Sequence, residues 1–475
     1  MKYLTPAAMA AITGGELNCP ADKMNTEITG ITSDSRKVAP GNLFVPFKGA
    51  SFDAHDFIPG VMEKGALITL TEREDTSADY PFIRVASSLK ALQKITAYYL
   101  KEMDVPVVSI TGSVGKTSTK EMVASVLAQK YKTLKTLGNF NNELGLPLTI
   151  ARLTDEDEVA VLEMGISHFG DMTELGEIAA PDISVITNIG TCHLENLIDR
   201  DGVFKAKTEI FDFLKPGGRV VLNGDDDKLC AVDTVNGMKP VFFGLDSRCD
   251  FWADEVRSLG IKGMTCTIHT PEEAFGVTVP IPGLHSVSNA LCACAVGHLL
   301  GVSPEEMKRG IEEVETLAGR FRLIDHKGMT IVDDCYNANP MSMKASLGVL
   351  HETEGRTVAI LGDMGELGTN EEALHREVGT YAVSHRPNLL LTVGPLARQI
   401  AEAAAEGCGA AVETGADAGE SLVDGADSKD RIIAFPDNAA LLKVLPKLVA
   451  AGDTILVKAS HFMNFTEIVN ALASL

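Results

Sequence analysis

The 475-residue sequence lacks any apolar run as long as a membrane-spanning helix needs, which is about 18 residues. It is also short of basic residues, because 42 Lys and Arg stand against 65 Asp and Glu and give a formal net charge of −23. Nucleic acids and anionic membrane surfaces are bound through many cations, so neither is expected as a partner. An anionic substrate would have to meet local basic residues.

Cysteines at metal-binding or redox spacing are absent as well. The nine cysteines are an odd number and no two have Cys-x-x-Cys spacing, which indicates reduced thiols in a cytoplasmic protein. Cys292 and Cys294 lie in an Ala-rich, helix-like stretch and are interpreted as packing residues. The apolar residues 7–12 are not interpreted as a signal peptide, since Thr5 and Pro6 are typical of the start of a short helix.

The pattern of apolar runs divides the chain into three α/β parts, as its length allows. Residues 1–84 mix short strands and turns and are interpreted as a small N-terminal module. Residues 85–316 alternate apolar runs with helical stretches, which predicts a mostly parallel sheet. The alternation restarts in residues 317–475, a doubly wound domain in which the Gly-, Ala- and acid-rich stretch 407–430 is expected to be a long loop. The strands expected in the two larger domains are 107–110, 159–163, 183–187, 220–223, 263–269, 277–282, 330–334, 357–362, 389–394 and 454–458.

The central domain begins with an apolar run, a Gly-rich turn and a helix, a pattern typical of a phosphate-binding loop. Residues 107–110 are expected to be a buried strand, and the apolar residues beyond Thr117 recur at helical spacing. Backbone N–H groups at the helix N-terminus would face an anion, Lys116 would contact the β and γ phosphates, and the Thr117 hydroxyl would hold Mg²⁺. The expected nucleotide contacts are Gly112, Ser113, Val114, Gly115, Lys116, Thr117 and Ser118.

This loop departs from the usual spacing, and the other candidate residues are ambiguous when taken singly. Ile110 stands where Gly-x-x-x-x-Gly-Lys-Thr has its first Gly, so an ordinary strand-to-helix turn stays open. Glu163 ends an apolar strand where a second metal ligand is expected, but it could equally be a solvated strand end. His193 follows a neighbouring strand at the same edge. Lys207 lies on an amphipathic helix, and its ammonium would be repelled by Mg²⁺.

Taken in order, these motifs resemble the ATP-dependent Mur ligases of peptidoglycan synthesis. Within that family, four further strings most resemble the branch that joins D-alanyl-D-alanine to UDP-N-acetylmuramoyl-tripeptide. The shared motifs are Thr111-Gly-Ser-Val-Gly-Lys-Thr117, Glu163-Met-Gly165, Thr187-Asn-Ile-Gly190 with His193-Leu-Glu195, Ala206-Lys207-x-Glu209-Ile210, Gly283-x-His285-x-x-x-Asn289-Ala290 and Gly319-Arg320. The branch-specific strings are Ser33-Asp-Ser-Arg36, Gly138-Asn-Phe-Asn-Asn-Glu-Leu-Gly-Leu-Pro147, Asp333-Asp-Cys-Tyr-Asn-Ala-Asn-Pro340 and Leu361-Gly-Asp-Met-Gly-Glu-Leu-Gly368.

The resemblance implies a ligase in which ATP phosphorylates the terminal carboxylate of the substrate and an amine then attacks the acyl phosphate. Lys116 and two Mg²⁺ ions would neutralise the transferring phosphoryl group. Thr117 and Glu163 would hold one ion and His193 the other. Lys207 falls on the carbamylated lysine of the family, and the carbamate would remove the charge conflict with the metal.

The resemblance also implies contacts to the nucleotide and to both substrates. Asn289 matches the adenine contact, and Arg320 and Asp334 match residues that reach the nucleotide when the third domain closes on it. Ser35 and Arg36 match contacts to the uridine diphosphate, although such clusters are often plain turns. The remaining substrate contacts are expected at Asn139 and Asn142, in the loop that faces the UDP-sugar-peptide, and at Asn337 and Asn339, near the incoming dipeptide.

Two differences from relatives bear on the acceptor. The Asp-Asn-Pro-Arg tetrad of many diaminopimelate-adding ligases is absent, and Tyr336-Asn-Ala-Asn-Pro340 ends a strand in its place, where Asn337 and Asn339 could orient a peptide amide or simply build the turn. Lys458-Ala-Ser-His461 stands where relatives commonly have Lys-Gly-Ser-Arg. The alternatives are another Mur-type ligase that adds a single amino acid, a folylpolyglutamate ligase, or a nucleotide-binding module without ligase activity. On family grounds we expect a monomer.

Overall fold

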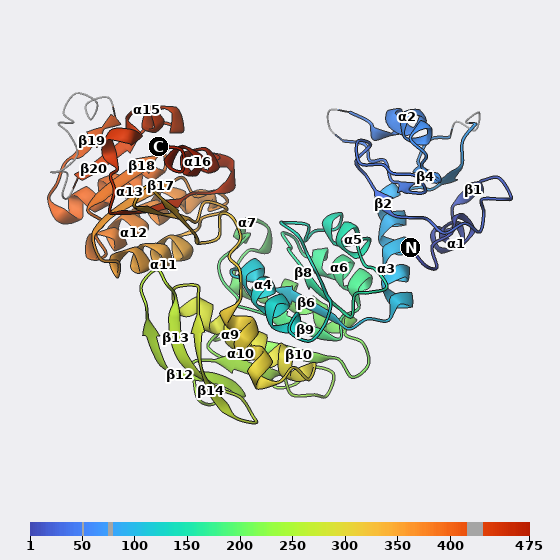
Figure 1. The fold of residues 1–475 in the computed structure, drawn as a ribbon, viewed down its shortest axis with the longest axis horizontal. Coiled ribbons are helices and arrows are strands. Elements are labelled where there is room, and N and C mark those ends of the chain that lie inside the picture. Colours follow the sequence, from blue (N-terminus) through green and yellow to red (C-terminus); the bar gives the residue numbers. More distant parts are fainter. Residues whose placement is uncertain (50–51, 75–78, 416–430) are drawn as a thin grey trace. The chain divides into compact units, whose positions relative to one another are not determined.

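The computed structural model describes residues 1–49, 52–74, 79–415 and 431–475, whose strands form three sheets with helices packed on them (Figure 1). The backbone divides into two compact units. The first holds residues 1–190, 199–251 and 292–310, and the second holds the remaining stretches 191–198, 252–291 and 311–475. Three α/β sheets confirm the predicted three-domain class, whereas the boundaries at 84 and 316 stay predictions.

The N-terminal sheet has five short strands in the order β1-β5-β4-β3-β2, parallel except for the β1–β5 pair. Thr5 caps the first helix with its side chain and Pro6 occupies the first turn, as the sequence predicts. Gly14 ends the helix at φ 69°. The elements are α1 (Pro6–Thr13), β1 (Glu16–Asn18), β2 (Ile31–Thr32), β3 (Leu43–Phe44), the 3₁₀ turn η1 (Ala54–Phe57), α2 (Ile58–Glu63), β4 (Ile68–Thr71) and β5 (Phe82–Arg84).

Six parallel strands form the sheet of the first unit that carries the Gly-rich turn, in the order β11-β10-β9-β6-β8-β7. Parallel strands place their carboxyl ends at one edge, so the polar residues after β6, β8 and β9 meet there. The strands are β6 (Val107–Thr111), β7 (Thr133–Lys135), β8 (Val159–Glu163), β9 (Ile183–Ile186), β10 (Arg219–Asn223) and β11 (Val241–Gly244). The helices that follow in this part of the chain are α3 (Ser88–Met103), α4 (Lys116–Leu127), α5 (Gly145–Ile150), α6 (Asp171–Ala179), α8 (Arg200–Thr208) and the 3₁₀ turn η2 (Glu209–Phe213).

Helix α7 lies between β9 and β10 in the sequence, and three antiparallel strands and two further helices come after β11. The predicted strands 263–269 and 277–282 are confirmed, although the second starts and ends earlier than expected. The elements are α7 (Leu194–Leu197), β12 (Phe251–Ser258), β13 (Met264–His269), β14 (Ala274–Val279), α9 (Leu284–Leu299) and α10 (Pro304–Glu312).

The C-terminal sheet has seven strands in the order β15-β16-β21-β17-β18-β20-β19, all parallel except β15. One face packs against α15 and α16 and the other against α11, α12 and α13, which confirms the doubly wound arrangement (Figure 1). The strands are β15 (Arg322–His326), β16 (Met329–Asp333), β17 (Arg356–Gly362), β18 (Leu389–Val393), β19 (Val412–Thr414), β20 (Arg431–Phe435) and β21 (Asp453–Lys458). The helices are α11 (Pro340–His351), η3 (Gly368–Asn370), α12 (Glu371–Ser384), α13 (Ala397–Cys408), α15 (Asn438–Leu448), η4 (His461–Met463) and α16 (Thr466–Leu472).

The long loop expected over 407–430 is wrong in its first part. Helix α13 continues to Cys408 and ends at Gly409 with φ 66°, and β19 then pairs with β20. Alanines favour the helix, and the neighbouring strand supplies hydrogen bonds that the sequence alone does not reveal. Residues 416–430 of this stretch lie outside the described residues.

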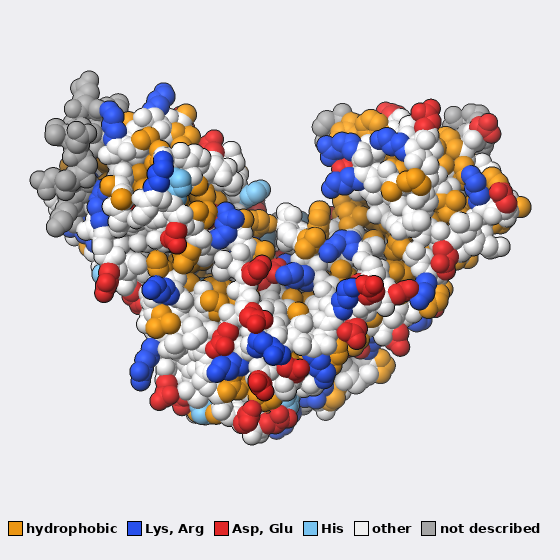
Figure 2. All heavy atoms as spheres, in the orientation of Figure 1, with side chains coloured by type: hydrophobic (Ala, Val, Ile, Leu, Met, Phe, Trp, Pro, Cys, Tyr) orange, Lys and Arg blue, Asp and Glu red, His pale blue; other side chains and the backbone are white. Residues whose placement is uncertain are grey.

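Acidic and basic side chains are interspersed on the face drawn in Figure 2. Within the described residues, no helix is long and apolar enough to cross a membrane.

Candidate active site

The Gly-rich turn after β6 has a backbone that only glycine fits. Gly112 has φ 154°, and a Cβ atom there would lie 1.9 Å from the Thr187 hydroxyl. Gly115 has φ 82° and precedes the first residue of α4, Lys116, whose Nζ donates to the Gly112 carbonyl at 2.9 Å. The N-terminus of α4 therefore lies at the carboxyl edge of the sheet, where its dipole favours an anion.

Residues that follow β9 hold this turn in place. The Asn188 carbonyl accepts from the Ser113 amide at 3.1 Å, and the Asn188 side-chain oxygen accepts from the Val114 amide at 2.9 Å. Thr187 donates its hydroxyl to the Val114 carbonyl at 2.8 Å, and the Gly190 amide donates to the Ser113 hydroxyl at 2.8 Å. The Thr-Asn-Ile-Gly motif thus shapes the loop. Because both loop amides donate within the protein, the phosphate contacts of Ser113 and Val114 stay predictions.

Glu163 and Thr117, the residues predicted to hold one metal ion, are in contact. Glu163 ends β8 with 2% of its surface exposed, and its Oε1 accepts from the Thr117 hydroxyl at 3.2 Å and from Asn141 Nδ2 at 2.8 Å. Its Oε2 is buried and makes no hydrogen bond. Mg²⁺ prefers oxygen ligands, so the free carboxylate oxygen of Glu163 and the nearby Thr117 hydroxyl are a suitable pair of ligands for it. The remaining ligands of a protein-bound Mg²⁺ often come from substrate phosphates and water.

Two residues of this site were missed by the sequence analysis. Asn141 orients Glu163, and its position between Asn139 and Asn142 in the branch-specific string was the available signal. Lys120 is fully buried on α4, with its Nζ 3.7 Å from Glu163 Oε2. The available signal was its position one helical turn after Lys116.

Other predicted residues are placed less specifically. Lys207 lies on α8, as expected, but only 1% of its surface is exposed, whereas most lysines on amphipathic helices are solvated. His193 has a left-handed backbone, φ 52°, and Asn289 is a buried residue of α9. Both belong to the second compact unit. Their expected roles at the metal and the adenine stay predictions.

The predicted contacts for the UDP-substrate lie in turns that also have internal hydrogen bonds. Arg36 donates to both carboxylate oxygens of Asp34 at 2.9 Å, and these bonds lower the pKa of Asp34 to about 2. The Ser35 carbonyl accepts from Lys64 Nζ at 2.8 Å. Arg36 is thus already held in position in this structure.

The two asparagines after β7 differ in their use. Asn139 is exposed, whereas the Asn142 side-chain oxygen accepts from the Gly145 amide at 2.8 Å and supports the start of α5. The substrate role of both stays a prediction.

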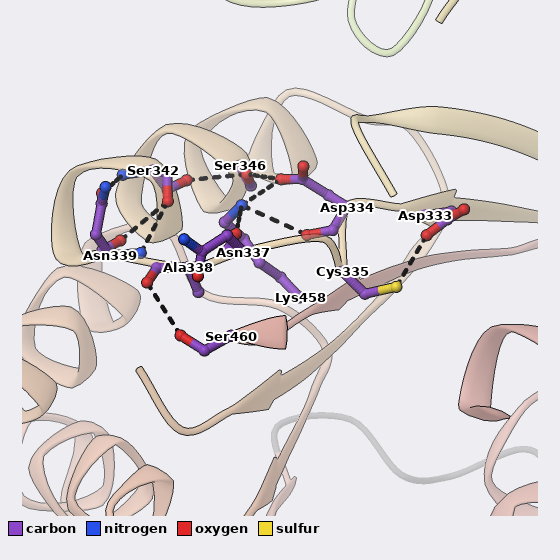
Figure 3. Close-up of polar contacts among 10 residues, drawn as sticks. All are labelled: Asp333, Asp334, Cys335, Asn337, Ala338, Asn339, Ser342, Ser346, Lys458 and Ser460. Carbon is purple, nitrogen blue, oxygen red and sulfur yellow. Dashed lines mark hydrogen bonds and ion pairs between the residues drawn. The ribbon is translucent and has the colours of Figure 1, made fainter. Parts of the chain in front are cut away.

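In the second unit, Lys458 and Asp334 form a buried ion pair at the carboxyl edge of the C-terminal sheet (Figure 3). Lys458 Nζ lies 2.6 Å from Asp334 Oδ2, which also accepts from the Ser346 hydroxyl at 2.7 Å. Lys458 further donates to the Asn337 carbonyl at 3.3 Å. The Lys458-Ala-Ser-His461 loop therefore holds the turn that carries the two predicted acceptor residues, and the carboxylate of Asp334 is neutralised within the protein.

The asparagines of this turn have structural hydrogen bonds as well. Asn339 forms a capping box with Ser342 at the start of α11, and its side-chain oxygen accepts from the Ser342 amide at 2.9 Å. The Asn337 side-chain oxygen accepts from the Ala338 amide at 2.9 Å. Figure 3 shows Asn337 beside Lys458 and Asn339 beside Ser342. Building the turn and orienting an acceptor are compatible, because each amide has a second polar atom.

The Tyr336 side chain of the same turn lies close to two other side chains, Arg320 and His461. The Arg320 guanidinium lies 4.1 Å from the centroid of the Tyr336 ring, a cation–π distance. The His461 ring, which stands where relatives commonly have Arg, lies 5.5 Å from Tyr336. Arg320 and His461 are therefore both grouped around one aromatic side chain.

The cysteines are free thiols, and the two predicted to be packing residues, Cys292 and Cys294, are buried. All nine lie within the described residues, and none of them forms a disulfide there. Cys292 and Cys294 are buried in α9, and burial raises the pKa of Cys266 to about 11 and of Cys335 to about 12. Thiols with such raised pKa values are poor nucleophiles at neutral pH.

Models of the Mur ligase family match successive parts of the chain. The catalytic-domain model matches residues 27–115, the middle-domain model 110–297, and the glutamate ligase domain model 319–461. A curated ligase from Bacillus subtilis is 36% identical over 452 residues, which cover 94% of this chain and 93% of the relative. The chain belongs to the Mur ligase family, as its motifs predict.

Several relatives carry the name of one branch of the family. The Bacillus subtilis protein is named UDP-N-acetylmuramoyl-tripeptide–D-alanyl-D-alanine ligase, and the Escherichia coli protein of the same name is 34% identical over 98% of this chain and 99% of its own. The crystal structure of MurF from Acinetobacter baumannii has a TM-score of 0.86 at 30% identity and covers 99% of both chains. MurF ligase from Thermotoga maritima, solved in complex with ADP, has a TM-score of 0.79 at 29% identity, covering 94% of this chain and 97% of that one.

Proposed function

We propose that this protein joins D-alanyl-D-alanine to UDP-N-acetylmuramoyl-tripeptide, with ATP converted to ADP and phosphate, in the cytoplasmic synthesis of peptidoglycan precursors. The observation that carries this proposal is the hydrogen-bonded pair of Glu163 and Thr117 beside the Gly-rich turn, with Glu163 Oε2 left for a cation. Relatives named for this reaction, matched over nearly the whole chain, support the choice of substrates.

The reaction has two balanced steps. A carboxylate oxygen of the tripeptide attacks the γ-phosphorus of ATP, the bond to the bridging oxygen breaks, and ADP leaves. The amine of the dipeptide then attacks the acyl carbon, phosphate leaves with that carboxylate oxygen, and the amine loses a proton. Lys116 and the N-terminus of α4 stabilise the transferring phosphoryl group. Thr117 and Glu163 would hold magnesium, which would supply further charge neutralisation when bound.

A carbamate on Lys207 and a second magnesium ion, with His193 as a ligand, are part of this proposal. The support for the carbamate is the nearly complete burial of the Lys207 side chain on α8, because a buried ammonium near two divalent ions would be strongly disfavoured. A carbamate on the same nitrogen is an anion and has oxygen ligands.

The remaining contacts follow the family pattern. Ser35, Arg36, Asn139 and Asn142 contact the UDP-substrate, and Asn289 contacts the adenine. In the C-terminal domain, residues 317–475 close on the nucleotide through Arg320 and Asp334. Asn337 and Asn339 orient the dipeptide, supported by their position on the turn that Lys458 holds.

The choice of acceptor distinguishes this branch from ligases that add a single amino acid. Phosphate release is measured with UDP-N-acetylmuramoyl-tripeptide, ATP and Mg²⁺, and with D-alanyl-D-alanine, D-alanine, L-lysine or diaminopimelate as the acceptor. We expect release that depends on both substrates and is strongest with the dipeptide. A strong preference for a free amino acid would overturn the acceptor assignment and leave the ligase mechanism standing.

A further inference from the structure

A buried charged residue of the P-loop helix has no part in the reaction as proposed. Lys120 lies one helical turn beyond Lys116 on α4, and its side chain is fully buried. Its Nζ donates to the Thr136 carbonyl at 2.6 Å and lies 3.0 Å from Glu121 Oε1 and 3.7 Å from Glu163 Oε2. A buried ammonium is costly unless it is paired, so these three oxygen atoms account for its presence.

Lys120 does not orient Glu163. The backbone amide of Glu163 donates to the Thr136 hydroxyl at 3.0 Å, and its Oε1 is fixed by Thr117 and Asn141. The 3.7 Å between the ammonium and Oε2 is too long for a hydrogen bond. Lys120 therefore acts on this carboxylate through its charge.

The charge of Lys120 is only partly neutralised by its nearest carboxylate, so it also acts on Glu163. Glu121, the other buried carboxylate in contact with Lys120, is also paired with Lys135 through its second oxygen. Two lysines and two glutamates thus balance one another in the metal-free protein. A divalent cation bound to Glu163 would lie close to the ammonium and be repelled by it.

We propose that Lys120 is a built-in counter-cation for Glu163, which balances this carboxylate in the metal-free enzyme and prevents a divalent cation from binding there alone. Magnesium then binds only together with the nucleotide, whose phosphates supply negative charge and further oxygen ligands. This inference rests on the proposed nucleotide site. Lys120 does not take part in the reaction itself, and its charge makes the binding of the cation depend on the nucleotide.

The test is a calorimetric titration of MgCl₂ into nucleotide-free protein. The variant Lys120→Met with Glu121→Gln removes the ion pair as a unit and leaves the net charge unchanged. We expect this double variant to bind Mg²⁺ at least about tenfold more tightly than the wild type, because the repulsion is removed. Adding Glu163→Gln should abolish the gain. Lys135→Met removes a lysine that pairs with the same Glu121, and it should produce no such gain.

Two results would overturn the inference. One is unchanged or weaker Mg²⁺ binding in the double variant with a wild-type circular dichroism spectrum. The other is Mg²⁺ binding to nucleotide-free wild type as tightly as to the ADP-loaded protein, which requires no variant and decides the question if the double variant does not fold. Failure of the wild type to bind ADP with Mg²⁺ would instead contradict the proposed function, while the nucleotide-free titrations would still decide the role of Lys120.

Discussion

Replacing Lys116 with alanine, or Glu163 with glutamine, is expected to lower kcat by about a thousandfold or more, because each change removes charge stabilisation from the transferring phosphoryl group. Lys116 begins α4 at the carboxyl edge of the sheet, and Glu163 keeps one carboxylate oxygen without a hydrogen bond. Glutamine is the sharper substitution at Glu163, since it can keep the hydrogen bond from Asn141 while removing the charge. The measurement is phosphate release at saturating concentrations of both substrates.

A lysine of the same unit provides the matched control for this prediction. Lys132 is exposed and paired with Glu156 at the surface, so Lys132→Met removes the same charge away from the site. It should retain wild-type activity. Near-normal turnover of Lys116→Ala or of Glu163→Gln, with thermal unfolding unchanged, would remove the assignment of the Gly-rich turn as the phosphate-binding loop.

Replacing Lys207 with alanine is expected to lower kcat by about a hundredfold or more, because the variant cannot form the proposed carbamate that would support the proposed second ion. A small carboxylate such as acetate, added at high concentration, should restore part of the activity by occupying the vacated space. In the wild type, ¹³C NMR after addition of ¹³C-bicarbonate should show a carbamate signal that the variant lacks.

The matched control lies two residues away on the same helix. Lys205 is exposed, with its Nζ 5.9 Å from the centroid of the Phe169 ring, so Lys205→Ala removes a lysine from α8 without removing a buried one. It should keep both the activity and the carbamate signal. Full activity of Lys207→Ala, or no carbamate signal in the Mg²⁺–nucleotide complex of the wild type, would contradict the carbamate.

The parts of the fold that the sequence predicts are those with local signals. The strands that precede the Gly-rich turn and Glu163 are continuous apolar runs, and α1 has a cap, a proline and a terminal glycine. The pairing of Thr117 with Glu163 was also predictable, because parallel strands bring their carboxyl ends together. Strand β19 was missed, since its three residues are held as a strand by β20 and have no pattern of their own.

The residues that sequence reasoning missed are polar groups whose roles depend on burial. Lys120 looks like an ordinary solvated lysine in the sequence, yet it is buried and lies near Glu163, which is far from it in the chain. The loop that begins with Lys458 was singled out, but its buried pairing with Asp334 was not predicted. Asn142 stays a predicted substrate contact and accepts from the Gly145 amide, whereas Asn141, which was not predicted, orients Glu163. Only the three-dimensional arrangement shows which of the two adjacent asparagines contacts Glu163.

The proposed reaction depends on an acyl-phosphate intermediate, and the transfer of an oxygen isotope tests directly whether this intermediate forms. UDP-N-acetylmuramoyl-tripeptide is labelled with ¹⁸O in its terminal carboxylate and allowed to react with ATP, Mg²⁺ and D-alanyl-D-alanine, and the released phosphate is analysed by mass spectrometry. Attack of the carboxylate on the γ-phosphorus, followed by amine attack at the acyl carbon, predicts one ¹⁸O atom in each phosphate. Unlabelled phosphate released together with the peptide product would contradict it.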